Sequence, residues 1–273
     1  MRVNGLAQLK PLTVATARIF NLIWSKPTAK PTLSPHEVHL WCATVEGPAF
    51  DFARLRGLLS SDESARATAF RFERDRRRFV AARAFLRTIL SLYLDCSPTE
   101  LHFKYTEYGK PALINFQVNA NLTFNLAHSG ELALYAITLE RAIGVDIEQI
   151  RQEFADDEIA RRFFSAREAS RLFSLPANDR LRAFFDCWTR KEAFIKAKGL
   201  GLSLPLDQFD VSLAPGERAQ LLETKWDPKE HSRWSLKAID VGPRYSAAVA
   251  VEGCDWQPSY WQAESDLLVQ FGS

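Results

Sequence analysis

Apolar residues after position 36 recur at the spacings of helices and strands. A spacing of three and four residues predicts an amphipathic helix over residues 76–94, with apolar positions at Phe79, Ala82, Leu86, Ile89 and Tyr93. A polar, helix-favouring stretch precedes it at residues 59–69. Apolar runs bounded by turn residues predict strands at residues 38–43, 122–126 and 132–138, the last two joined by a turn at residues 128–130.

The second half of the chain repeats this order of helix and strands. It predicts a helix over residues 159–173, another that ends at Gly199, and strands at 209–213, 234–239 and 246–251. We therefore expect an α+β fold of two similar halves, each with a long helix packed on a small antiparallel sheet. The expected units are an N-terminal half at 37–142, a C-terminal half at 143–258 and a tail at 259–273. A cleft between such halves is a natural ligand site.

Residues 1–36 differ from the rest of the chain. They hold five Lys or Arg residues and four prolines, and the first acidic residue is Glu37. Serine is too sparse for a transit peptide, and no apolar segment with a small-residue cleavage site marks a signal peptide. We expect a mobile N-terminal extension with a short helix over residues 14–24, and we assign it no function.

Composition and charge exclude several classes of function. A net charge of +2 gives no general attraction to nucleic acid or membranes, and no apolar run reaches the length of a membrane span. The arginine-rich run at residues 71–78 contains Glu73 and Asp75, so it predicts a solvated helix start or a docking surface for an acidic partner. The scattered cysteines, at 42, 96, 187 and 254, favour neither a zinc site nor a disulfide framework. We expect a cytoplasmic monomer that binds neither nucleic acid nor membranes.

The helix that ends at Gly199 carries charged groups beside its apolar stripe. Trp188, Glu192 and Lys196 follow one another at four-residue steps, so their side chains lie along one line of the helix. Gly199 and Gly201 then stop the helix. The pattern alone fits a solvent-exposed ion pair between Glu192 and Lys196.

Two further acidic residues interrupt an apolar strand at residues 142–150. Asp146 and Glu148 point to one face of an extended strand, because side chains alternate. Either that face is wet, or a divalent cation relieves the repulsion between the carboxylates. With Glu192 as a third oxygen donor, the set would suit Mg²⁺.

Two turns contribute candidate ligand-binding groups. His128 lies beside a tight bend, and Lys110 is fixed between Gly109 and Pro111. Each residue type is common at such positions without any ligand, so the local sequence leaves both roles open.

Taken together, these stretches resemble the 4′-phosphopantetheinyl transferases, in particular the two-domain type that acts on peptide-synthetase, polyketide and fatty-acid carrier proteins. The resemblance covers residues 37–251 and rests on four motifs in order. They are Gly109-Lys110-Pro111, the stretch FNLAHSG at 124–130, GVDIE at 144–148, and WTRKEAFIKAKGLGL at 188–202. Ala127 stands where the family commonly has serine, which removes a hydroxyl contact to coenzyme A.

The resemblance implies a pseudo-duplicated fold with coenzyme A at the joint between the halves. It implies Mg²⁺ ligands at Asp146, Glu148 and Glu192, and catalytic roles for Glu192, Lys196 and Asp146. The implied coenzyme A contacts are Lys196 and His128 at the phosphates, with Arg66, Lys110, Pro111 and Asn125 completing the set.

The implied activity is that of a holo-acyl-carrier-protein synthase. A serine of an apo acyl or peptidyl carrier protein would attack the β-phosphate of coenzyme A, giving the holo carrier and 3′,5′-ADP. Either Glu192 or a metal-bound water would accept the serine proton. The alternative is a family member that binds coenzyme A or a carrier protein without catalysis.

Overall fold

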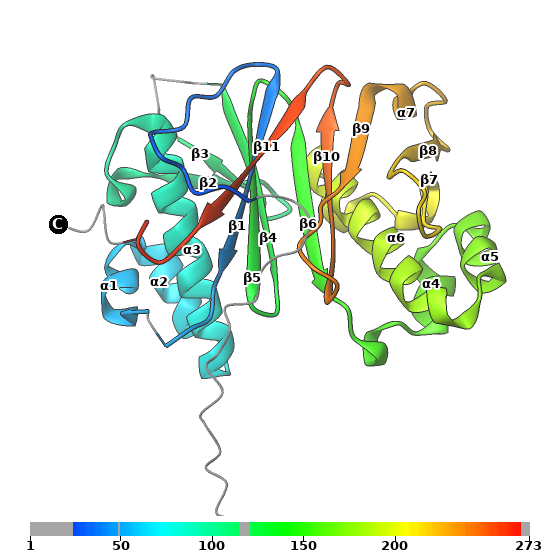
Figure 1. Cartoon of the computed structure of the whole chain (residues 1–273), viewed down its shortest axis with the longest axis horizontal. Helices are drawn as coiled ribbons and strands as arrows, with labels where there is room; N and C mark the ends of the chain where they lie inside the picture. The colour runs from blue at the N-terminus through cyan, green and yellow to red at the C-terminus, as the bar shows by residue number, and fades with distance from the viewer. Residues whose placement is uncertain (1–23, 49, 115–120, 269–273) are drawn as a thin grey trace, which may run out of the picture.

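The computed structural model describes residues 24–48, 50–114 and 121–268. Two long helices stand on opposite sides of the molecule, with two sheets between them (Figure 1). This arrangement confirms the predicted α+β fold of two halves, each with a long helix on a small sheet. The expected helix at residues 14–24 lies almost wholly outside the described residues. Among those residues, we find no helix both long enough and apolar enough to cross a bilayer.

The first half is built around helix α3 and a four-stranded sheet in the order β11-β1-β5-β4. Apolar side chains of α3 pack on the outer face of this sheet, where Trp41 and Tyr135 are fully buried. The helices are α1 (Phe52–Gly57), α2 (Ser61–Thr68) and α3 (Glu73–Leu94). The strands are β1 (Glu37–Thr44), β2 (Phe103–Tyr105), β3 (Pro111–Leu113), β4 (Leu122–Ser129) and β5 (Leu132–Leu139).

The second half is built around helix α6 and a three-stranded antiparallel sheet in the order β6-β10-β9. The predicted apolar stripe of α6 faces this sheet and the helices α4 and α5. The helices are α4 (Asp157–Phe163), α5 (Ala166–Ser174), α6 (Ala177–Lys198) and α7 (Glu230–Arg233). The strands are β6 (Ile143–Gln149), β7 (Phe209–Val211), β8 (Leu221–Thr224), β9 (Trp234–Ala238) and β10 (Tyr245–Glu252). Strand β11 (Gln257–Ala263) follows them in the chain but belongs to the sheet of the first half.

The two sheets meet through their inner faces and through two edge strands. A third apolar cluster joins β1 and β5 of the first sheet to β6 and β10 of the second. Strands β4 and β6 lie side by side at the joint, where side chains of β4 bind backbone groups of β6. The joint is therefore a continuous part of the core.

Three predicted elements differ in the structure. The single helix expected at 159–173 is two helices, because Ser165 leaves the helical conformation and caps α5 through the amide of Glu168. The turn expected at 128–130 begins later, since His128 and Ser129 still belong to β4. Helix α3 starts at Glu73, three residues before the predicted start.

The ends of the described chain pack against the body of the protein. Strand β11 spans the expected boundary at residue 258 and pairs in parallel with β1 of the first half. Ser25 forms an isolated bridge with Trp261, and the Trp24 indole donates to the carbonyl of Asp240. Part of the expected extension therefore lies against both halves.

Candidate active site at the joint of the two halves

Close approach of α6 to β6 builds the site. A Cβ atom at Gly144 would overlap the backbone of Ala193 and Ala197, so only glycine allows the helix to lie this near the strand. The contact places Glu192 and Lys196 over the face of β6 that carries the acidic residues.

Lys196 bonds to the strand and not to its own helix. Its ammonium lies 2.5 Å from Oδ1 of Asp146, and about a third of its side chain is exposed. Burial opposes the positive charge, but the attraction of Asp146, together with that of Glu192 and Glu148, outweighs burial and raises the pKa of Lys196. The exposed ion pair between Glu192 and Lys196, which the pattern alone allowed, is therefore wrong.

Glu192 lies among negative charges in a buried setting. Burial, followed by repulsion from Asp146, raises the pKa of Glu192 to about 7. Burial and the same neighbour also raise the pKa of Glu148. The three predicted metal ligands are thus electrostatically coupled, and Glu192 titrates near neutral pH.

Hard-cation chemistry fits these acidic residues, although they do not form a closed cluster. No three Asp, Glu, His or Cys side chains in the described part of the chain form a ready-made metal centre. Mg²⁺ commonly uses only one or two carboxylates and completes its shell with waters and substrate phosphates. Oδ2 of Asp146 is buried without a hydrogen-bond partner, so an acceptor suited to a cation is available there.

All six residues predicted to contact coenzyme A line one cavity of about 370 Å³ beside this site. Three of them are basic residues and a fourth is His128. One of the basic residues, Lys196, connects the cavity to Asp146. Desolvation, followed by the charges of Lys196, Arg78 and Arg66, lowers the pKa of His128. The predicted residues in this cavity are Arg66, Lys110, Pro111, Asn125, His128 and Lys196.

Lys110 and Asn125 also connect the two halves. The Lys110 ammonium donates to the carbonyls of Ile143 and Lys196, and burial lowers the pKa of Lys110 to about 8. Oδ1 of Asn125 accepts from the amide of Val145 at 2.9 Å. Ala127 of β4 is buried in the third apolar cluster, which joins the two sheets.

The structure adds site residues that the sequence pattern did not indicate. Arg83 and Tyr105 line the same cavity, and Arg83 is held by the buried carboxylate of Glu63. Ser129 donates to Oε2 of Glu148 at 2.8 Å. Arg83 was hidden in an apolar helical run, whereas Ser129 stood next to His128 in a recognised motif.

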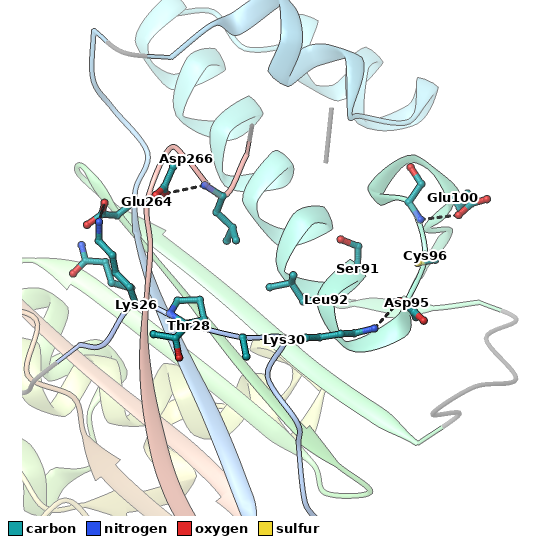
Figure 2. Close-up of a pocket in the computed structure, with 15 residues that line it drawn as sticks. Lys26, Thr28, Lys30, Ser91, Leu92, Asp95, Cys96, Glu100, Glu264 and Asp266 are labelled. Carbon is teal, nitrogen blue, oxygen red and sulfur yellow. Dashed lines mark hydrogen bonds and ion pairs between the residues drawn. The ribbon is translucent and has the colours of Figure 1, made fainter. Parts of the chain in front are cut away.

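Other charged groups lie away from the site. Lys191 is fully buried against Glu168 and two backbone carbonyls, so it packs α6 and does not face the cavity. Another cavity, of about 600 Å³, lies at the C-terminal end of α3 (Figure 2). Its two lysines, Lys26 and Lys30, pair with Glu264 and Asp95. Both lysines are therefore neutralised, and two further acidic residues, Glu100 and Asp266, line the same cavity.

Models of known protein families match both halves of the chain. A family described as the 4′-phosphopantetheinyl transferase superfamily matches residues 142–250, and one described as the N-terminal part of 4′-phosphopantetheinyl transferase matches residues 47–140. The match to a solved structure of Thermotoga maritima holo-[acyl-carrier-protein] synthase covers 41% of this chain and 62% of that protein, with 19% identity and a TM-score of 0.32.

This chain also matches two curated relatives, in each case over most of the relative's length. The 4′-phosphopantetheinyl transferase HetI of Nostoc sp. is 40% identical over 238 residues, which are 87% of this chain and 97% of HetI. The 4′-phosphopantetheinyl transferase Sfp of Bacillus subtilis is 30% identical over 203 residues, which are 74% of this chain and 86% of Sfp. The chain therefore belongs to the 4′-phosphopantetheinyl transferase family.

Proposed function

We propose that this chain transfers the 4′-phosphopantetheine arm of coenzyme A to a serine of apo acyl or peptidyl carrier proteins, with Mg²⁺, and releases 3′,5′-ADP. The observation that carries the proposal is Lys196, which lines a cationic cavity and also bonds to the buried acid Asp146. Such an arrangement brings positive charge and carboxylate oxygens that can bind a metal ion close together, where both can act on one phosphate group.

The cavity supplies the binding site for the nucleotide end of coenzyme A. Arg66, Lys110 and His128 project into it from three different elements of the first half, and Lys196 enters from α6. An anionic ligand between them would contact both halves. Positive groups in a partly buried cavity stabilise phosphates more strongly than they would in open water.

Asp146 and Glu148 would hold Mg²⁺, with Glu192 beside them. When bound, the cation supplies positive charge to the pyrophosphate and relieves the repulsion among the carboxylates. Lys196 adds a fixed positive charge that stabilises the leaving phosphate of 3′,5′-ADP. These residues therefore neutralise charge at the phosphorus without forming a covalent bond to it.

Glu192 is the proposed acceptor of the serine proton. Burial and repulsion from Asp146 raise the pKa of Glu192 above that of an ordinary glutamate, which favours this carboxylate as a proton acceptor. The serine oxygen then forms its bond to the β-phosphorus of coenzyme A. The bond to the 3′,5′-ADP oxygen breaks, and the arm stays on serine as a phosphodiester.

The arginine-rich run supports carrier docking only in part. Arg76 and Arg77 pair with Glu73, and Arg78 pairs with Glu46. These pairs neutralise much of the charge offered to an acidic carrier. A charge reversal at Arg77 should weaken the carrier more than coenzyme A if this surface docks the carrier.

A mass-shift assay tests the proposal. Apo carrier proteins from fatty-acid, polyketide and peptide pathways are incubated with the protein, coenzyme A and Mg²⁺, and their intact masses are measured. We expect at least one carrier to gain the mass of the arm, and chelation of Mg²⁺ to prevent it. Binding of coenzyme A without mass gain on any carrier would favour the non-catalytic alternative.

A further inference from the structure

We infer that Ser129, a residue of the first half, is a positioning residue that fixes Glu148 of the second half for divalent-cation binding. The inference rests on the proposed function, because it concerns the same cation. Its basis is a two-step hydrogen-bond chain across the joint of the sheets.

The first step of the chain fixes Ser129 itself. Its Oγ accepts from the backbone amide of Gln149 at 3.0 Å, although β4 and β6 belong to different hydrogen-bonded sheets. The side chain is thus bound to a rigid backbone group of β6. An accepted bond from the amide directs the hydroxyl proton elsewhere.

The second step uses that proton to orient the acid. The Ser129 hydroxyl donates to Oε2 of Glu148 at 2.8 Å and leaves Oε1 without a bond to this serine. A glutamate side chain otherwise loses considerable rotamer freedom when it binds a cation. A preformed bond to one oxygen reduces that cost while the other oxygen stays available.

Gly130 keeps Ser129 within reach of β6. It has a φ of +56°, and a Cβ atom there would lie 2.7 Å from the hydroxyl of Tyr245 and 2.8 Å from Oε1 of Gln149. The Tyr245 hydroxyl also accepts from the amide of Glu131. The serine and glycine of the FNLAHSG motif therefore share one task, which is to hold the end of β4 against Glu148.

Asp146 is held by a different kind of contact from that of Glu148. Asp146 is fixed by Lys196, which comes from the second half. Within the described residues, Ser129 is the one hydrogen-bond donor to the Glu148 carboxylate that the structure shows. The first half therefore acts on the cation site through Ser129.

The test measures metal affinity without turnover. The whole protein is titrated with Mn²⁺ in place of Mg²⁺, and electron paramagnetic resonance measures the concentration of Mn²⁺ that stays unbound. Ser129→Ala should weaken Mn²⁺ binding about 10-fold, as the loss of an outer-shell partner commonly does. Ser129→Thr keeps the hydroxyl and should stay within about threefold of the unmodified protein.

A matched control separates this role from simple packing. Ser246 lies on β10 opposite Glu148, is also buried, and bonds to Asp186 and Thr189. Ser246→Ala should leave Mn²⁺ affinity unchanged. If Ser129→Ala fails to fold, the size-matched pair Ser129→Thr and Ser129→Val gives the same comparison.

The outcomes distinguish this inference from the proposed function. Equal Mn²⁺ affinity in the unmodified protein and Ser129→Ala overturns the inference, as does an equal loss in Ser246→Ala. An unmodified protein that binds no Mn²⁺ overturns it as well. The absence of any mass gain on carriers, with Mn²⁺ affinity reduced only in Ser129→Ala, instead overturns the proposed transfer.

Discussion

Lys196 of α6 and Asp146 of β6 form an ion pair of 2.5 Å between the two most specific motifs of the chain. The opposite charges neutralise each other and join α6 to β6 at the proposed site. Binding of coenzyme A and Mg²⁺, as proposed, would give both groups further partners of opposite charge.

We expect Asp146→Asn to lower turnover about 1000-fold, because it removes a charged oxygen ligand and the partner of Lys196. Steady-state mass-shift kinetics measure the loss, and circular dichroism checks that the fold is kept. Asp210→Asn is the control, since Asp210 lies on β7 outside the cavity of Lys196, and its one ion pair within the described residues is a weak one with Arg167 at 3.9 Å. Full activity in Asp146→Asn would contradict the assignment of Asp146.

Glu192→Gln should stabilise the metal-free protein at pH 8 but much less at pH 5. The pKa of Glu192 is about 7 in the folded state against an ordinary value of 4.5. The folded protein therefore holds this proton more tightly, and its stability falls as pH rises from 4.5 through 7. The full cost above pH 7 is about 3 kcal/mol.

Thermal unfolding with a chelator present measures this difference at both pH values. Glutamine does not titrate in this range, so the stability of Glu192→Gln relative to the unmodified protein should increase between pH 5 and pH 8. A gain of the same size at both pH values would show that repacking, and not charge, is responsible.

The affinity for coenzyme A should fall as pH rises through about 8, where Lys110 loses its charge. Lys110→Arg keeps a charge at all these pH values and should give a flatter profile. Calorimetric titration with coenzyme A measures both. Lys104→Arg, on the exposed neighbouring strand β2, should retain the unmodified profile.

Gly144→Ala should destabilise the protein by more than about 3 kcal/mol, since the new methyl group overlaps backbone atoms that cannot rotate away. Any folded fraction should also lose activity, because α6 would move away from β6. Denaturant unfolding tests the first effect. Gly57→Ala is the control, as its Cβ would meet nothing within 4 Å; equal stability of both variants would contradict the close approach.

The sequence predicted best those features that depend on local periodicity. The helix α3, the strands β4 to β6 and the apolar face of α6 each follow from spacing within one segment. The break at Ser165 was missed although the capping signal, serine with Glu168 three residues later, was present. That signal was outweighed by apolar residues that continued at helical spacing across it.

Contacts between distant segments could not be predicted in this way. Spacing placed Lys191 and Lys196 on one helix, but the partner of each comes from elsewhere, Glu168 from α5 and Asp146 from β6. Only the packed structure decides which lysine is buried and which faces a ligand. The same holds for Ser129, whose partner Glu148 lies in the other half.

The parallel pairing of β11 with β1 has a consequence for the order of folding. β11 follows β1 in the chain only after every helix and strand described for the second half, so one edge of the first sheet stays open until that half has been synthesised. An open strand edge is a template for association with other chains. Expression of the first half alone would leave β1 permanently in that state, and we expect such a fragment to aggregate.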